Sequence, residues 1–285
     1  MDAELRDVVA AGLGVAVAAA RPVHGGDVAR SYRLTLSDGA TVFAKTRSGA
    51  DPAFFHTEAD GLRWLREADA LPVPEVLLVG ERVPLLVLEW IDEARDRPSG
   101  DAAFGRALAA LHETGAPCFG RGDRRTTGSR GLPNEPTGTW AEFYADNRLL
   151  PLARLAADEG ALPTSTIDDM ERLADRLQMI GGPAEPPARL HGDLWAGNRI
   201  VDAAGRSWLI DPAAHGGHRE FDLAMMRLFG GWADDAFAAY HEAAPLAPGW
   251  EDRIAIHQLA PLAVHAIKFG GPYAAATTAA VERYR

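Results

Sequence analysis

Strand-like segments in the first third of the chain, followed by a helical remainder, constrain the fold more than any other feature. Four segments are rich in β-branched and apolar side chains: residues 31–36, 41–44, 76–79 and 85–91. A charged, proline-ended segment follows at 92–98, and beyond it apolar residues recur mainly at helical spacing. We therefore predict an α+β chain of two lobes, with a small sheet-rich lobe in residues 1–91 and a larger helical lobe in residues 92–285.

Local signals support this division. Asp38-Gly39 separates two strand-like segments and predicts an antiparallel hairpin, because both residues tolerate positive φ. Helices are predicted at 3–20, 52–67, 101–113, 139–157, 166–180 and over most of 219–285. Residues 114–138 are rich in glycine, proline and arginine, and long irregular segments of this kind are often functional.

Nothing near the start of the sequence resembles a targeting or membrane segment. The apolar stretch 8–20 is shorter than the about 20 residues that span a bilayer. Asp2, Glu4 and Asp7 give the preceding segment the wrong charge for a signal peptide. We expect a cytoplasmic protein with no membrane partner.

Composition narrows the possible partners. The chain has 29 Lys and Arg against 40 Asp and Glu, a net charge of −11, which disfavours nucleic acid as a partner because phosphate backbones require basic surfaces. Its single cysteine, Cys118, excludes an intramolecular disulfide and a cysteine-rich zinc site. A small phosphorylated ligand remains possible, because it needs only a few local cations.

The densest group of polar residues lies between strand-like segments in the second half of the chain. His191-Gly192-Asp193 is followed by Asn198, which gives the D-x-x-x-x-N spacing of a kinase catalytic loop, and later by Asp211. Phosphoryl transfer needs a carboxylate to accept the nucleophile's proton, and oxygen ligands for Mg²⁺. We predict Asp193 as the base, and Asn198 and Asp211 as the metal ligands. His191 would orient the turn rather than bind metal.

The first lobe would supply the contacts to ATP. Lys45 ends a strand-like segment, as the phosphate-binding lysine of kinases does, and Glu58 in the next predicted helix could pair with it. Gly25 and Gly26 could bring backbone amides to the phosphates, although a plain turn explains them equally well. Backbone groups of Glu89, Trp90 and Ile91 could bind the adenine edge.

Other motifs are weaker. Gly12 and Gly14 begin a G-x-G without a preceding strand, so a dinucleotide site is not supported. His112 and His241 each precede a glutamate, but neither has the second histidine of a zinc-protease motif. We expect both histidines on helix surfaces.

The segment 190–198 closely resembles the L-H-G-D-L-W-[SA]-G-N signature of the fructosamine kinase (ketosamine 3-kinase) family. Two further segments are similar to that family: 211–225, with D-P-A, G-H-R-E and D-L-A-M, and 54–65 around Glu58. The resemblance spans residues 20–230. It implies a bilobal protein-kinase-like fold with a small antiparallel-sheet lobe.

The same resemblance implies ATP-dependent, Mg²⁺-assisted phosphorylation of the 3-hydroxyl of a ketosamine, either a small sugar–amine adduct or a glycated protein lysine, in protein deglycation repair. Trp195 would stack on the sugar, or alternatively anchor the turn as a core aromatic. His218 and Glu220 would line the substrate pocket, or form a buried network with Asp222. Two other interpretations stay open: a phosphotransferase for an aminoglycoside, choline or another amino-alcohol, and a nucleotide-binding pseudokinase regulator.

Overall fold

The computed structural model describes residues 1–23, 29–94, 101–123 and 132–285. The chain forms two compact units, residues 1–98 with 199–211, and residues 99–198 with 212–285. The predicted boundary between the lobes, after residue 91, differs from this division, because residues 199–211 pack with the N-terminal unit. The predicted α+β class with a small antiparallel sheet and a mainly helical remainder is confirmed.

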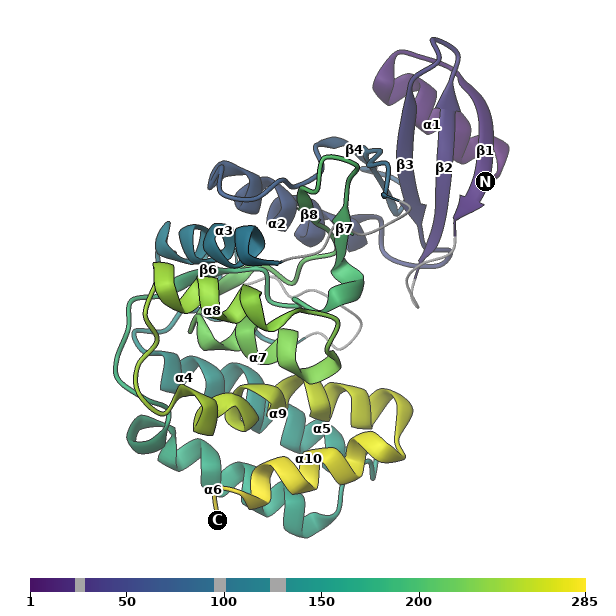
Figure 1. Ribbon diagram of the computed structural model, residues 1–285. Coiled ribbons are helices and arrows are strands. Elements are labelled where there is room, and N and C mark those ends of the chain that lie inside the picture. Colours follow the sequence, from purple (N-terminus) through teal and green to yellow (C-terminus); the bar gives the residue numbers. More distant parts are fainter. Residues whose placement is uncertain (24–28, 95–100, 124–131) are drawn as a thin grey trace. The chain divides into compact units, whose positions relative to one another are not determined.

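The N-terminal unit is built on a five-stranded antiparallel sheet in the order β1-β2-β3-β5-β4. Its strands are β1 (Val17–Val23), β2 (Arg30–Leu36), β3 (Thr41–Thr46), β4 (Val76–Val79) and β5 (Leu85–Glu89). Turn residues Asp38 and Gly39 join β2 to β3, which confirms the predicted hairpin. Helix α1 (Ala3–Leu13) lies against this sheet (Figure 1). Its Val9 joins Leu34 and Val87 in one apolar cluster.

The prediction of one helix over residues 3–20 is wrong. Helix α1 ends at Leu13, because Gly14 adopts a left-handed conformation (φ 71°) and returns its N–H to the carbonyl of Ala10. Residues 17–23 form β1, which pairs with β2. Alanine-rich composition favoured a helix, but pairing with a neighbouring strand overrides such local preference.

Two further elements complete this unit. The 3₁₀ turn Pro52–Phe55 leads into α2 (His56–Glu67), close to the predicted helix. The short hairpin of β7 (Arg199–Val201) and β8 (Ser207–Leu209) follows the catalytic-loop segment in the sequence and is joined to this unit by a hydrogen bond from Leu209 N to Pro72 O.

The C-terminal unit is mainly helical. Its α-helices are α3 (Ala102–Glu113), α4 (Trp140–Tyr144), α5 (Leu150–Asp158), α6 (Thr164–Ile180), α7 (Glu220–Phe229), α8 (Asp234–Ala243), α9 (Trp250–Phe269) and α10 (Pro272–Glu282). A π-helical turn, Ala145–Leu149, joins α4 to α5, so the predicted helix over 139–157 contains an irregular centre. A two-stranded ribbon of β6 (Ala188–Leu190) and β9 (His215–Gly217) frames the catalytic loop.

One buried tyrosine stabilises the long helix α9. Pro261 lies inside this helix and cannot donate a hydrogen bond to the carbonyl of His257. The Tyr144 hydroxyl lies 3.1 Å from that carbonyl oxygen and 2.7 Å from Ile256 O, so its single hydrogen is shared between the two. A side chain from α4 thus supplies a donor near the carbonyl that the proline leaves without one.

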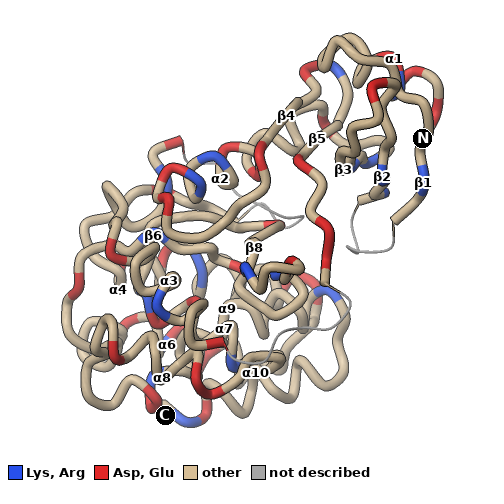
Figure 2. Tube along the Cα trace, turned by 45° about the horizontal axis from the view of Figure 1, so that its top comes forward, with Lys and Arg blue, Asp and Glu red and all other residues tan. Residues whose placement is uncertain are grey.

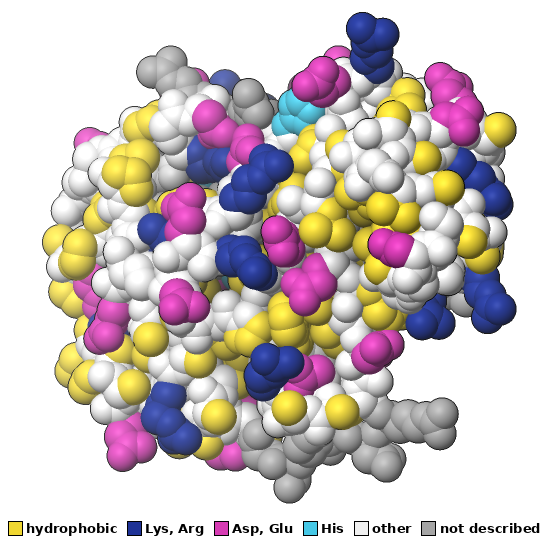
Figure 3. All heavy atoms as spheres, turned by 90° about the horizontal axis from the view of Figure 1, so that it is seen from above, with side chains coloured by type: hydrophobic (Ala, Val, Ile, Leu, Met, Phe, Trp, Pro, Cys, Tyr) yellow, Lys and Arg dark blue, Asp and Glu magenta, His cyan; other side chains and the backbone are white. Residues whose placement is uncertain are grey.

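Charged residues of both signs are distributed along the chain. Figure 2 shows Asp and Glu spread over many segments rather than gathered in one. On the face in Figure 3, basic and acidic side chains are interspersed among apolar ones. Among the described residues, no helix combines the length and apolar character needed to cross a membrane.

Candidate active site

The predicted catalytic loop is a compact turn between β6 and β7. Asn198, at the end of the 3₁₀ turn Ala196–Asn198, donates its side-chain amide to the backbone oxygen of Asp193 at 2.9 Å and to its carboxylate Oδ2 at 3.0 Å. His191 is buried, and its Nδ1 accepts the N–H of Asp193 at 3.2 Å. The structure therefore brings the predicted base and Asn198 together, and His191 makes the predicted orienting hydrogen bond.

A buried carboxylate on α7 fixes the backbone of this loop. Asp222 accepts the N–H of His191 at 2.8 Å and the N–H of Gly192 at 2.9 Å. Burial by itself raises the pKa of Asp222, but the hydrogen bond and charge of His112 outweigh it and hold that pKa below its usual range. His112 Nε2 lies 3.2 Å from Asp222, and Nδ1 lies 2.8 Å from the Tyr240 hydroxyl.

His112 therefore has a different place from the one predicted. It is buried inside the C-terminal unit, so its prediction as a helix-surface residue is wrong, whereas His241 is exposed as predicted. The signal in the sequence is the run of five apolar residues, 107–111, that precedes it in α3, because a polar residue in apolar surroundings is normally paired.

Two glycines give the loop its shape. Gly192 has a φ of 81°, and a Cβ there would lie 2.2 Å from the Ala213 carbonyl oxygen. A Cβ on Gly197 would lie 2.1 Å from the Trp195 indole. The indole thus lies over the space that a side chain at position 197 would occupy, and Trp195 remains 41% exposed instead of being buried in the core.

The N-terminal unit contains the second polar group. Lys45 on β3 is buried and lies 2.5 Å from Glu58 Oε1 on α2, and it also forms an ion pair with Asp211, which follows β8. Burial lowers the pKa of Lys45, but the two carboxylates outweigh burial and raise it. Burial raises the pKa of Glu58 to about 7, against the opposing charge of Lys45. The predicted Lys45–Glu58 pair is present.

Asp211 has an unusual backbone conformation. Its φ is 51°, and among the described residues only Asp69 shares a positive φ without being glycine. Such a conformation is unfavourable for a side chain with a Cβ and recurs at functional sites. The remaining predicted nucleotide contacts lie at the end of β5: Glu89 ends the strand, Trp90 Nε1 donates to Asp92 at 2.8 Å, and Ile91 follows. Gly25 and Gly26 lie outside the described residues.

Asn198 in the C-terminal unit and Asp211 in the N-terminal unit each carry an oxygen ligand that suits Mg²⁺. An amide oxygen and a carboxylate are hard oxygen donors of the kind that Mg²⁺ prefers. The amide nitrogen of Asn198 donates a hydrogen bond to Asp193, which orients the amide as a whole. Each of the two residues therefore fits the predicted ion by its own chemistry.

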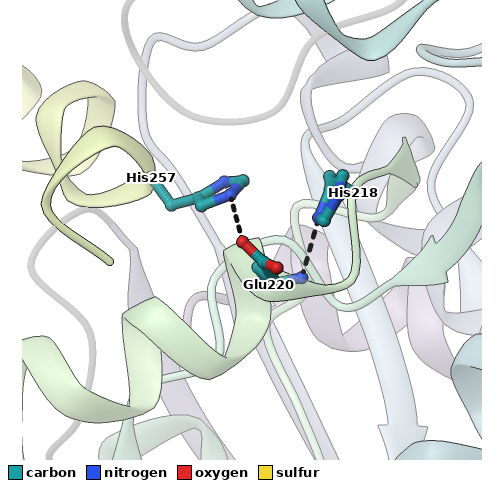
Figure 4. A group of neighbouring side chains, drawn as sticks. All are labelled: His218, Glu220 and His257. Atoms are coloured by element: carbon teal, nitrogen blue, oxygen red, sulfur yellow. Dashed lines mark hydrogen bonds and ion pairs between the residues drawn. The ribbon is translucent and has the colours of Figure 1, made fainter. Parts of the chain in front are cut away.

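His218 and Glu220 belong to a buried network (Figure 4). Both oxygens of Glu220 accept hydrogen bonds from Arg253, and His257 Nε2 lies 3.4 Å from Oε2. Burial would raise the pKa of Glu220, but His257 and Arg253 lower it to about 2. The ligand atoms of His218, Glu220 and His257 lie within 4.8 Å of one another, but the carboxylate is already held by the guanidinium. Both predicted substrate residues are thus enclosed within the C-terminal unit.

Comparisons with known proteins identify the family. The family model for fructosamine kinase matches residues 1–285. A probable ketoamine kinase of Synechocystis sp. is 34% identical over 260 residues, which cover 89% of this chain and 85% of the relative. A probable ketoamine kinase of Enterococcus faecium is 34% identical over 266 residues, which cover 92% of this chain and 94% of the relative.

Solved structures extend the comparison. The crystal structure of a fructosamine-3-kinase candidate from Thermobifida fusca is 41% identical, with a TM-score of 0.88 over 98% of this chain and 97% of that one. A thermostable mutant of aminoglycoside phosphotransferase APH(4)-Ia, in complex with ADP and hygromycin B, shares the fold at 14% identity, with a TM-score of 0.62 over 99% of each chain. Because the family model covers the whole chain and relatives match most of it at above 30% identity, this protein belongs to the fructosamine kinase family and is a kinase of the protein-kinase-like fold.

Proposed function

We propose that this kinase transfers the γ-phosphate of ATP to the 3-hydroxyl of a ketosamine, a sugar–amine adduct such as fructosamine or ribulosamine. The observation that carries the proposal is the catalytic loop, in which Asp193 is held by Asn198 while the Trp195 indole lies exposed two residues away. The loop thus combines a base for a hydroxyl group with an aromatic face for a sugar ring.

Asp193, Asn198 and Trp195 of the catalytic loop have separate roles in this reaction. The Asp193 carboxylate accepts the proton of the sugar hydroxyl as that oxygen attacks the γ-phosphorus, and the bond from this phosphorus to the β–γ bridging oxygen breaks to release ADP. The amide of Asn198 keeps the carboxylate oriented. The indole of Trp195 packs on the apolar face of the sugar and selects rings over flexible alcohols.

Lys45 binds the phosphates of ATP. It is one of two lysines in the chain and is held by Glu58 and Asp211, so its ammonium is kept in place and charged. Asn198 and Asp211 would hold Mg²⁺, which when bound would neutralise charge on the phosphates. The ADP bound in the APH(4)-Ia complex supports nucleotide binding by a chain of this fold. Backbone groups at 89–91 would contact its adenine.

A substrate panel tests the proposal. ADP release is measured with ATP and Mg²⁺ in the presence of fructosamine, ribulosamine, a glycated lysine peptide, an aminoglycoside and choline. We expect strong stimulation by the ketosamines and none by choline. If only the aminoglycoside or choline stimulates ADP release, the ketosamine is not the acceptor. If the protein binds ATP but turns over none of these acceptors, the pseudokinase interpretation is favoured.

A further inference from the structure

The C-terminal unit exposes a group of aromatic side chains that begins at Trp195 and extends beyond it, to rings that the proposed reaction at the sugar does not use. Among the described residues, five large apolar side chains are exposed, and three of them belong to this group: Trp195 at 41%, Phe229 at 38% and Phe269 at 50%. Single exposed apolar residues need no explanation, but a cluster beside a catalytic loop indicates a binding surface. We call Trp195, Phe229, His265, Phe269 and Tyr273 the aromatic platform.

The rings of the platform contact one another in sequence. Trp195 meets Phe229 edge to face with centroids 6.1 Å apart, and Phe229 lies 5.2 Å from His265. His265 in turn lies 5.7 Å from Phe269 and 5.0 Å from Tyr273. The platform thus runs continuously from the catalytic loop to the end of α9 and the start of α10.

The backbone beneath the platform is closely fitted to the catalytic loop. Gly231 follows α7, and a Cβ there would lie 2.6 Å from the Cβ of Ala196. The turn that follows Phe229 is therefore packed against the residue next to Trp195. His265 is oriented as well, because its Nδ1–H donates to Pro261 O at 2.8 Å. These contacts hold the rings in place before any ligand binds, which reduces the entropy lost on binding.

We infer that the aromatic platform binds the group attached to the amine nitrogen of the ketosamine, and that the enzyme prefers amines carrying an aromatic or large apolar group. The inference rests on the proposed function. With the sugar on Trp195, the platform is the surface onto which the amine side of the acceptor can extend without leaving the unit. Aromatic faces also attract the protonated amine itself.

Two synthetic acceptors test the inference: the fructose adduct of phenethylamine and that of methylamine. We expect the wild-type KM to be about tenfold lower for the phenethyl adduct, with similar kcat. Phe269→Ala should raise KM for the phenethyl adduct about tenfold and leave KM for the methyl adduct unchanged. Phe269 is half exposed, so its truncation should leave the fold intact.

Met179→Ala is the matched control, because Met179 is 76% exposed on α6 and lies outside the platform. It should change neither KM. Turnover of both adducts with equal KM, or an equal loss on both in Phe269→Ala, overturns the platform inference but leaves the proposed function standing. Absence of turnover with either adduct overturns both. A dimer that Phe269→Ala converts to monomers would assign the platform to contact between two copies instead.

Discussion

At the scale of single residues, the shape of the catalytic loop depends on its glycines, which have no side chain, as much as on the residues that carry one. The Trp195 indole occupies the space beside Gly197, where a Cβ would lie 2.1 Å from the ring. The exposed position of the tryptophan is thus a consequence of a glycine two residues later. Predicting it needs the folded turn, because a large aromatic residue in a sequence is more often buried.

Trp195→Ala and Gly197→Ala should therefore have related effects. Removal of the indole, or its displacement by the new methyl group, should raise KM for a ketosamine about tenfold while KM for ATP stays unchanged. Steady-state kinetics with each substrate varied separately measures this, and Trp195→Phe serves as the milder control. An equal rise in both KM values would instead indicate a folding role for Trp195.

Asp193 supports a second prediction at this scale. Asp193→Asn keeps the shape of the side chain but removes the proton acceptor, so kcat should fall at least about 100-fold. The affinity for ATP, measured by calorimetry, should change less than about twofold, because binding the nucleotide does not require the base. Near-normal turnover in this variant would show that another group takes the proton.

At the scale of elements, helix α7 controls the catalytic loop through its third residue. Asp222 is fully buried and accepts the N–H groups of both His191 and Gly192. His112 on α3 and Tyr240 on α8 extend this network, so three helices fix one loop. Sequence spacing indicated the loop residues, but only packing of the helices could bring His112 to Asp222.

Asp222→Asn tests the role of this helix. The asparagine can accept through only one atom, so one buried N–H of the loop loses its partner and the free energy of unfolding should fall by about 1–3 kcal/mol. In addition, kcat should decrease because the backbone of Asp193 is no longer held. Urea unfolding and steady-state kinetics measure the two effects. Asp234→Asn on α8, an exposed carboxylate, is the control and should change neither.

At the scale of the whole molecule, buried histidines couple stability to pH. Burial lowers the pKa of His215 to about 3 and, with help from His257, lowers the pKa of His218 to about 4. In the unfolded chain both would titrate near their ordinary value of about 6.5. Between these values the unfolded state binds more protons than the folded state, so acidification favours unfolding.

The free energy of unfolding should therefore decrease as the pH falls from 7 to 5, by about 2 kcal/mol for each of these histidines. Urea titrations at the two pH values measure the decrease. His218→Gln should remove about half of the decrease that His215 and His218 together cause. His241→Gln, at an exposed histidine, is the control and should leave the decrease unchanged. An identical pH dependence in wild type and His218→Gln would show that His218 does not contribute.

The sequence by itself determined the family, the α+β class and the residues of the catalytic-loop motif, because these depend on short spacings and local periodicity. The Lys45–Glu58 pair was also predictable, since a strand-end lysine and the next helix lie close together in the chain. Tertiary structure alone decided that residues 17–23 form a strand, that His112 is buried and that Trp195 is exposed. Each of these depends on contacts that form only in the folded chain: pairing of β1 with β2, packing of His112 against Asp222, and the turn that places Trp195 over Gly197. In such contacts the burial of apolar surface and the satisfaction of polar groups outweigh local preference.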